Sequence, residues 1–144
     1  MKQFERIERI SGRERFARAN RLRSSLDFAR LRRDGRRVGG AYLALSYARQ
    51  PAPEGAPMVK EQPARVGFSV SKRVGGAVVR NRVKRRLREA VRVRLTSFHP
   101  GWDIVISARP AAANADYATL DAELGGLIER ARLARNTRDQ DSRP

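Results

Sequence analysis

A dense run of cations marks the part of this sequence most suited to chemistry, the stretch from Ser71 to Leu95, SKRVGGAVVRNRVKRRLREAVRVRL. Its second half has a helical pattern in which nearly every residue outside one apolar stripe is Lys or Arg, and Glu89 is the only acid. Like charges three or four residues apart destabilise an isolated helix by about 0.2–0.5 kcal/mol per pair. A merely solvated helix surface usually mixes charges of both signs, which this one does not. The pattern therefore favours a helix that binds a polyanion, above all nucleic acid.

The apolar stripe of this helix has the spacing of a face that packs on a core. Its members are Val79, Val83, Leu87, Ala90 and Val91. The cations around it are Arg80, Arg82, Lys84, Arg85, Arg86, Arg88, Arg92 and Arg94.

Side chains that could carry out catalysis are scarce. His99 is the only histidine and stands beside Pro100 at an expected helix end, where a capping or exposed role is favoured over that of a general base. The sequence contains no cysteine, which excludes disulfides, zinc ribbons and thiol catalysis. Its acids are dispersed, and Gly75-Gly76 has neither P-loop nor dinucleotide-binding spacing. If an RNA reaction involves this protein, another molecule is expected to supply the chemistry.

Length and charge limit the possible classes of protein. The 144 residues suffice for one domain with a real core. The net charge of +17 exceeds what solubility requires and favours phosphate backbones, bound in a salt-dependent manner. No stretch approaches the roughly 20 apolar residues of a membrane span, and the N-terminus lacks the apolar core of a signal peptide. We therefore expect a cytoplasmic protein that has no membrane partner.

A short helix is expected ahead of the cationic stretch. Ser24 or Ser25 can cap its N-terminus, and Gly35 can end it. Phe28 could belong to the core or face a ligand groove, and the sequence leaves both alternatives open. The expected apolar contacts of this helix are Leu26, Ala29 and Leu31.

Strand-like segments lie on both sides of a proline-rich loop. Residues 36–49 show strand-like alternation, and Gly39-Gly40 permits a turn or bulge within them. Four prolines exclude regular structure from the loop, residues 50–64. Residues 65–71 form a second expected strand, in which every other residue is small. That small face would let a bulky ligand lie against the sheet.

The rest of the chain predicts one more strand and one more helix. The strand is Trp102 to Ala108, and the helix begins at Asp116 and continues to Arg135. We expect residues 20–135 to form a single RNA-binding domain, residues 1–19 a flexible basic arm and residues 136–144 a disordered tail. The order of helix, two or three strands, helix, strand and helix predicts the α+β class.

The segment SVSKRVGGAVVRNRVKRRLREA closely resembles the signature of the bacterial ribonuclease P protein family, an Arg-Asn-Arg helix preceded by a basic glycine loop. The flanks agree, because RLRSSLDFARLRRDG is similar to the first helix of the family, RVGFSVS to its central strand and WDIVISARPAA to the strand after the signature helix. The resemblance covers residues 20–135. The matching signature residues are Lys72, Arg73, Gly75, Ala77, Val78, Arg80, Asn81, Arg82, Lys84, Arg85 and Arg88.

The resemblance implies a fold and a function. The fold is a mixed sheet of about four strands packed by three helices in the order α-β-β-β-α-β-α, similar to the second domain of a small-subunit ribosomal protein, with a left-handed β-α-β crossover that opposes the general rule. The function is that of a ribonuclease P subunit, in which a catalytic RNA with RNA-bound Mg²⁺ removes the 5′ leader of precursor tRNA endonucleolytically. The protein, one monomer per RNA, would assist and would have no active site of its own.

The resemblance also implies two sets of binding residues. Aromatic residues of the leader-binding cleft would stack on bases at about 1–3 kcal/mol each. Arg32 stands where the family commonly has a second aromatic, so contact there would be ionic or cation–π. Asn81 could fix the loop-to-helix junction or touch RNA. The residues expected on the catalytic RNA are Lys72, Arg73, Arg80, Asn81, Arg82, Lys84, Arg85 and Arg88, and those expected in the leader-binding cleft are Phe28, Arg32, Tyr42, Phe68 and Ser69.

Other functions explain less of the sequence. A binding module without catalysis, such as a ribosomal protein, accounts for the charge and the fold class but not for the spacing of the signature. A helix-turn-helix protein needs a helix three or four residues before the recognition helix, where a strand is expected. A self-contained nuclease would need metal ligands that the sequence does not group together.

Overall fold

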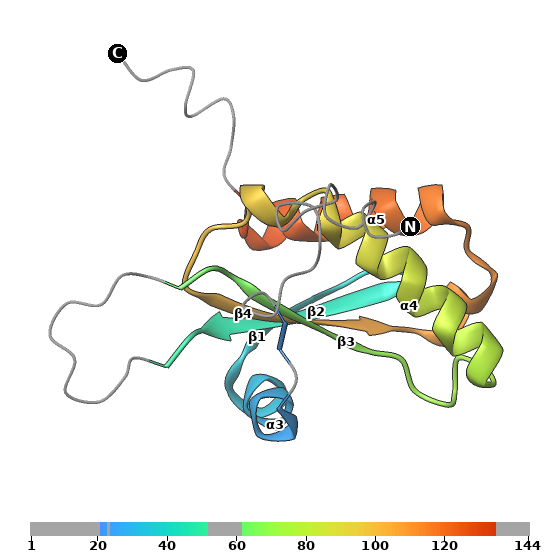
Figure 1. Ribbon diagram of the computed structural model, residues 1–144, viewed down its shortest axis with the longest axis horizontal. Coiled ribbons are helices and arrows are strands. Elements are labelled where there is room, and N and C mark those ends of the chain that lie inside the picture. Colours follow the sequence, from blue (N-terminus) through green and yellow to red (C-terminus); the bar gives the residue numbers. More distant parts are fainter. Residues whose placement is uncertain (1–20, 23, 52–61, 135–144) are drawn as a thin grey trace, which may run out of the picture.

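The computed structural model describes residues 21–22, 24–51 and 62–134, and there it contains a four-stranded sheet with helices on both faces (Figure 1). Helices α4, Ala77–Arg92, and α5, Tyr117–Ala131, cover one face, and α3, Ser25–Asp34, crosses the other. This arrangement confirms the α+β class. The expected arm, the expected tail and most of the proline-rich loop lie outside the described residues. The strands are β1 Arg36–Gly39, β2 Leu43–Arg49, β3 Arg65–Ser69 and β4 Trp102–Ala108, and two 3₁₀ helices are η2 Leu95–Ser97 and η3 Pro110–Asn114.

The strands are ordered β1-β2-β4-β3 across the sheet. The β1–β2 hairpin turns at the expected glycine pair, β2 pairs antiparallel with β4, and β3 pairs parallel with β4. Helix α4 connects the two parallel strands, which confirms the strand-helix-strand unit of the expected order. The hand of its crossover stays a prediction. None of the described helices is both long enough and apolar enough to cross a membrane.

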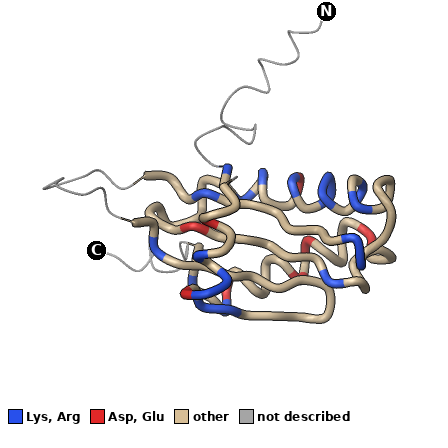
Figure 2. Tube along the Cα trace, turned by 90° about the horizontal axis from the view of Figure 1, so that it is seen from below, with Lys and Arg blue, Asp and Glu red and all other residues tan. Residues whose placement is uncertain are grey.

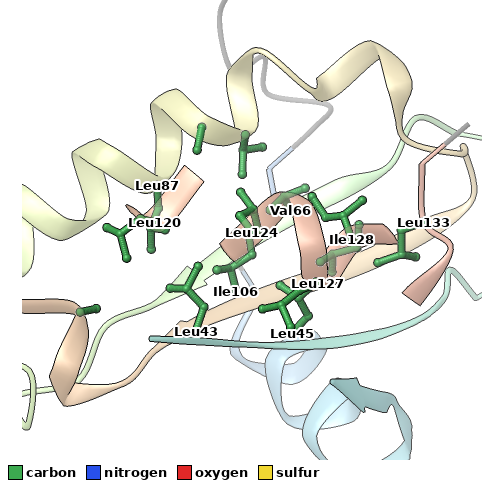
Figure 3. Close-up of a cluster of buried hydrophobic side chains, with 14 of the residues drawn as sticks. Leu43, Leu45, Val66, Leu87, Ile106, Leu120, Leu124, Leu127, Ile128 and Leu133 are labelled. Atoms are coloured by element: carbon green, nitrogen blue, oxygen red, sulfur yellow. The ribbon is translucent and has the colours of Figure 1, made fainter. Parts of the chain in front are cut away.

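The main core lies between the sheet and the α4–α5 layer (Figure 3). Its sheet side consists of alternate strand residues, and burial of each large side chain contributes roughly 1.5–3 kcal/mol. The stripe expected on α4 is confirmed, since four of its members are buried and Val79 is partly buried against them. The sheet residues at the centre of this core are Leu43, Leu45, Ile104 and Ile106, and those of α5 are Leu120, Leu124, Leu127 and Ile128.

Helix α3 contacts the sheet through fewer apolar residues than expected. Leu31 is buried and Phe28 packs beside it, but Leu26 is 80% exposed and Ala29 is exposed as well. The expectation for these two residues was wrong because, at 100° per residue, Leu26 lies about 140° around the helix from Leu31. Ser24 caps the helix as expected, its Oγ accepting the Leu26 N–H at 3.1 Å.

The ends of α3 and α5 differ from the usual left-handed glycine cap. Gly35 follows α3 in an extended conformation, and glycine is needed because a Cβ there would lie 2.5 Å from the Leu31 carbonyl oxygen. Helix α5 begins after the Asp116 cap as predicted but ends at Ala131, four residues before its expected end. Arg132 adopts φ 59°, and this turn directs Leu133 back into the core.

A buried carboxylate anchors α3 to the sheet. Asp103 of β4 is fully buried, and its oxygens accept bonds from Arg65 of β3 at 2.7 and 2.8 Å and from Arg30 of α3 at 2.5 Å. The bond to Asp103 raises the pKa of Arg65 above its ordinary value. The sequence interpretation placed Asp103 as a strand residue and did not find this cluster, because its partners are 38 and 73 positions away.

We predict that Asp103→Asn lowers the free energy of unfolding by roughly 3 kcal/mol. This value is at the lower end of the range for breaking a buried ion pair, because the guanidinium groups of Arg30 and Arg65 keep some solvent access. Urea denaturation measures the change. Asp34→Asn removes an exposed carboxylate paired with Arg33 and should cost less than about 0.5 kcal/mol. Equal effects of the two substitutions would contradict an anchoring role for Asp103.

Candidate nucleic-acid interface

The basic loop before α4 is held by its own backbone. The N–H of Val74 donates to the Ser71 carbonyl at 3.0 Å, and the N–H of Arg73 donates to Ser71 Oγ at 3.3 Å. Gly75 has φ 156°, and a Cβ there would lie 2.9 Å from the Val79 side chain, so glycine is required where the loop enters the helix. This local bonding leaves the side chains of Lys72 and Arg73 exposed.

The N-terminus of α4 adds to the positive potential of this loop. Gly76 is the N-cap residue and provides no side-chain acceptor, and the first turn contains no acid. The free N–H groups and the helix dipole therefore favour an anion here.

The arginines of α4 divide into an inward and an outward set, and the inward set binds backbone carbonyls. Arg86 donates to the Ala115 carbonyl at 2.6 Å, and Arg82 donates to the Ala113 carbonyl at 3.3 Å, which ties the helix to η3 and the loop after it. Arg80 Nε donates to the Gly75 carbonyl at 3.1 Å and closes the loop onto the helix. Arg80 and Arg82, expected to contact RNA, are thus already engaged within the protein.

The C-terminal part of α4 carries its own ion pairs. Arg94 bonds Asp121 of α5 and the Ala90 carbonyl, and Gly125 gives its guanidinium room, since a Cβ there would lie 3.0 Å from a terminal nitrogen. Arg92 pairs with Glu89 and holds the pKa of that carboxyl below its ordinary value. Glu89 thus offsets the charge of Arg92, and the outward cations Lys84, Arg85 and Arg88 have no such partner among the described residues.

The outward set is the expected RNA-contacting surface. Asn81, Arg85 and Arg88 are exposed, and Lys84 is half-buried at the side of the helix. None of these four has a polar partner among the described residues, in contrast to the inward arginines. Figure 2 shows Lys and Arg recurring along α4 on successive turns. We name Lys72, Arg73, Asn81, Lys84, Arg85 and Arg88 the helix surface.

A cavity of about 580 Å³ lies beside the edge strand β3 and joins α4 to α3. Lys84 and Arg88 line it from α4, and Phe28 lines it from α3. A cavity that combines aromatic rings with cations suits single-stranded nucleic acid, whose bases stack and whose phosphates pair. The other lining residues are Arg21, Leu22, Val66, Gly67 and Phe68.

Phe28 lies in this cavity because β3 has no side chain beneath it. A Cβ on Gly67 would lie 2.6 Å from Cζ of the Phe28 ring. The ring is only partly buried, so Phe28 both packs on the sheet and lines the cavity. Phe28 therefore contacts the sheet and also lines a cavity, and its role in ligand binding stays a prediction.

Small residues form a row across the sheet on the α3 side. Register places Ser69, Ser107, Ala44 and Gly39 opposite one another on β3, β4, β2 and β1. Asp27 and Arg30 lie on the flank of α3 that meets Arg65 and Asp103. The opposite flank, with Phe28 and Arg32, therefore faces this small-residue row. The small face expected from the sequence of β3 thus extends over all four strands.

The structure does not bring all the expected cleft residues to this side. Phe28, Arg32 and Ser69 belong to it, but Phe68 pairs with Ile106 and shares the core face of the sheet. Tyr42 also packs against the main core. Phe68 still lines the β3-edge cavity, whereas Tyr42 does not.

Two polar residues at the β1–β2 end of the sheet were not found from the sequence. Glu123 of α5 accepts N–H bonds from Ala41, Tyr42 and Leu43 at 2.7–3.0 Å and so fixes the β1–β2 turn. The Arg109 guanidinium lies against Gly39 at the end of the small-residue row. The alternation of β4 places Arg109 on the same face as Ser107, a signal that the sequence interpretation did not use.

Comparison with known proteins identifies what the chain resembles. The family model described as Ribonuclease P matches residues 16–132. The ribonuclease P protein component of Streptomyces bikiniensis is 46% identical over 111 residues, 77% of this chain and 90% of that relative. The Roseiflexus castenholzii component is 44% identical over 115 residues, 79% of this chain and 87% of that relative.

Solved structures agree with this family. The RNase P protein of Staphylococcus aureus superposes with a TM-score of 0.69 at 25% identity, covering 81% of this chain and 98% of that chain. The RNase P protein of Thermotoga maritima gives a TM-score of 0.64 at 26% identity, covering 76% and 96%.

Adjacent arginines of α4 provide a matched test of the inward and outward sets. We predict that Arg86→Ala lowers the free energy of unfolding by about 1–2 kcal/mol, because the buried Ala115 carbonyl loses its donor. Arg85→Ala should change stability by less than about 0.5 kcal/mol. In titrations with a single-stranded RNA homopolymer, Arg85→Ala should reduce the slope of log K against log salt by about 0.7, and Arg86→Ala should not. The division into inward and outward arginines would be refuted if Arg85→Ala destabilised the protein and Arg86→Ala reduced the salt slope.

Proposed function

The chain belongs to the ribonuclease P protein family, and from this premise we propose that its two surfaces bind the two RNAs of that enzyme. The chain is a protein subunit of ribonuclease P, which processes the 5′ end of precursor tRNA. The helix surface binds the catalytic RNA, and the α3 side of the sheet binds the 5′ leader.

One observation carries the first assignment: the outward cations of the loop and of α4 have no polar partner among the described residues, while the inward arginines are bonded to carbonyls. Charges that folding leaves unpaired at this density destabilise the helix unless a polyanion binds them. Arg85 and Arg88 offer forked donors to phosphate oxygens. Arg80 and Arg82 act mainly by holding the loop and η3 in place.

The second assignment rests on Phe28 and its surroundings. Its ring lies over Gly67 at the edge of the sheet, next to a cavity that also contains Lys84 and Arg88. A leader that leaves the catalytic RNA near α4 would meet this cavity first and then the small-residue row. Arg32 would contact it by charge, where other family members place an aromatic ring.

The chemistry belongs to the RNA in this proposal. No three His, Asp or Glu side chains among the described residues gather into a group that could hold a metal ion. The residues that the structure describes therefore do not form a dedicated Mg²⁺ site, and we assign Mg²⁺ to the RNA. The protein acts as one monomer per RNA, in the bacterial cytoplasm where precursor tRNA is made.

The proposal predicts that Phe28→Ala weakens the holoenzyme's affinity for precursor tRNA by about 5–150-fold, the loss of one base stack of about 1–3 kcal/mol. Affinity for mature tRNA, which has no leader, should not change. Equilibrium binding of both labelled tRNAs measures the difference.

Phe28→Leu serves as the folded control, since it keeps apolar contact with the sheet but removes the aromatic ring. It should reproduce most of the loss for precursor tRNA with a nearly unchanged melting temperature. Phe28 would be a core residue only, against the proposal, if Phe28→Ala lowered the melting temperature while leader-dependent binding stayed intact.

A further inference from the structure

A second group of arginines lies at the sheet edge opposite to the edge strand β3. The sequence from Arg32 to Arg37, RRDGRR, ends α3 and begins β1. Arg32, Arg36 and Arg37 are exposed and have no polar partner among the described residues, while Arg33 pairs with Asp34 at 3.2 Å. Figure 2 shows a second group of blue residues away from the row on α4. Among these arginines, only Arg32 belongs to a surface of the proposed function.

The small-residue row leads from the helix surface to this edge. It begins at Ser69, directly before the basic loop, and ends at Gly39 of β1. Arg37 pairs opposite Ser46, so its side chain lies on the same face of the sheet as the row. Two residues along one strand are about 7 Å apart, which places Arg37 next to Gly39 and the Arg109 guanidinium that covers it.

The length of the row limits what can reach this edge. Three interstrand spacings of about 4.8 Å separate β3 from β1, or about 14 Å in all. That distance corresponds to roughly four stacked nucleotides at 3.4 Å each, and to fewer nucleotides of an extended strand. A leader that passes Phe28 and follows the row therefore reaches β1 within a few nucleotides.

The acids near the β1 edge do not neutralise its arginines. Asp34 forms an ion pair with Arg33, and Glu123 accepts hydrogen bonds from three backbone N–H groups of the β1–β2 turn. The free guanidinium groups therefore favour the phosphates of a nucleic-acid strand.

We propose that Arg37, next to the Arg109 guanidinium, forms a second phosphate-binding surface, which holds the leader upstream of the nucleotides at Phe28. Arg36 pairs opposite the core residue Tyr47, so its side chain points to the other face of the sheet. This inference rests on the proposed function, because it requires the leader to run along the α3 side of the sheet. Its consequence is that long leaders bind more tightly than short ones and that the gain depends on salt.

The test compares precursor tRNAs with leaders of about four and about twelve nucleotides, bound to holoenzyme made from the full chain and a bacterial ribonuclease P RNA. With the unchanged protein, the longer leader should bind more tightly. Arg37→Gln should abolish that gain and reduce the salt slope for the longer leader by about 0.7, the value for one phosphate contact. Arg37 is exposed, so the melting temperature should stay the same.

Arg85→Gln is the matched control, because it removes an exposed arginine from the helix surface and should weaken assembly with the catalytic RNA whatever the leader length. The inference is overturned if Arg37→Gln keeps the full gain from the longer leader. It is also overturned if Arg37→Gln weakens short, long and leaderless tRNAs equally, since Arg37 would then hold another RNA segment.

A comparison with Phe28→Ala separates the two levels of the proposal. If the unchanged protein shows no gain from the longer leader but still shows the effect of Phe28→Ala, only the β1-edge surface is refuted. If neither effect is seen, the leader does not follow this side of the sheet, and both proposals fail.

Discussion

The arrangement of the proposed leader-binding side depends on one buried carboxylate, Asp103. It joins β4 to β3 through Arg65 and to α3 through Arg30, and a buried charge of this kind is tolerated only with such partners. Helix α3 has Leu31 as its only fully buried residue, so apolar contact alone would define its rotation poorly. The ion cluster turns one flank of α3 towards the Asp103 end of the strands, and the opposite flank, with Phe28, then faces the small-residue row.

The arginines of α4, which contribute to the net charge of +17, divide into a bonded and an unbonded set. Arginines that point inward donate to carbonyl groups of the loop, of η3 and of the segment after it, and they stabilise the position of α4 without any RNA. Arginines that point outward find no partner in the described part of the protein. The same residue type therefore occurs on one helix both bonded to carbonyl groups and without a partner, and the two sets are separated by about a third of a turn.

The periodic features of the fold could be predicted from the sequence, and the long-range contacts could not. The stripe from Val79 to Val91 and the limits of β4 follow from local spacing, and both are confirmed. The exposure of Leu26 and the core-facing side chain of Phe68 depend on how α3 and β3 meet the sheet. The inward direction of Arg82 and Arg86 depends on carbonyl groups some 30 positions away, which no local pattern reveals. The row from Ser69 to Gly39 required the register of four strands.

The most direct test of the account is cleavage of a 5′-labelled precursor tRNA at low Mg²⁺ concentration. A bacterial ribonuclease P RNA, this protein and their mixture are assayed side by side. Because the protein has two proposed RNA-binding surfaces and its described residues group no metal ligands, the mixture should cleave faster than the RNA alone, and the protein alone should not cleave. Cleavage by the protein alone, or no stimulation by the folded protein, would contradict the account.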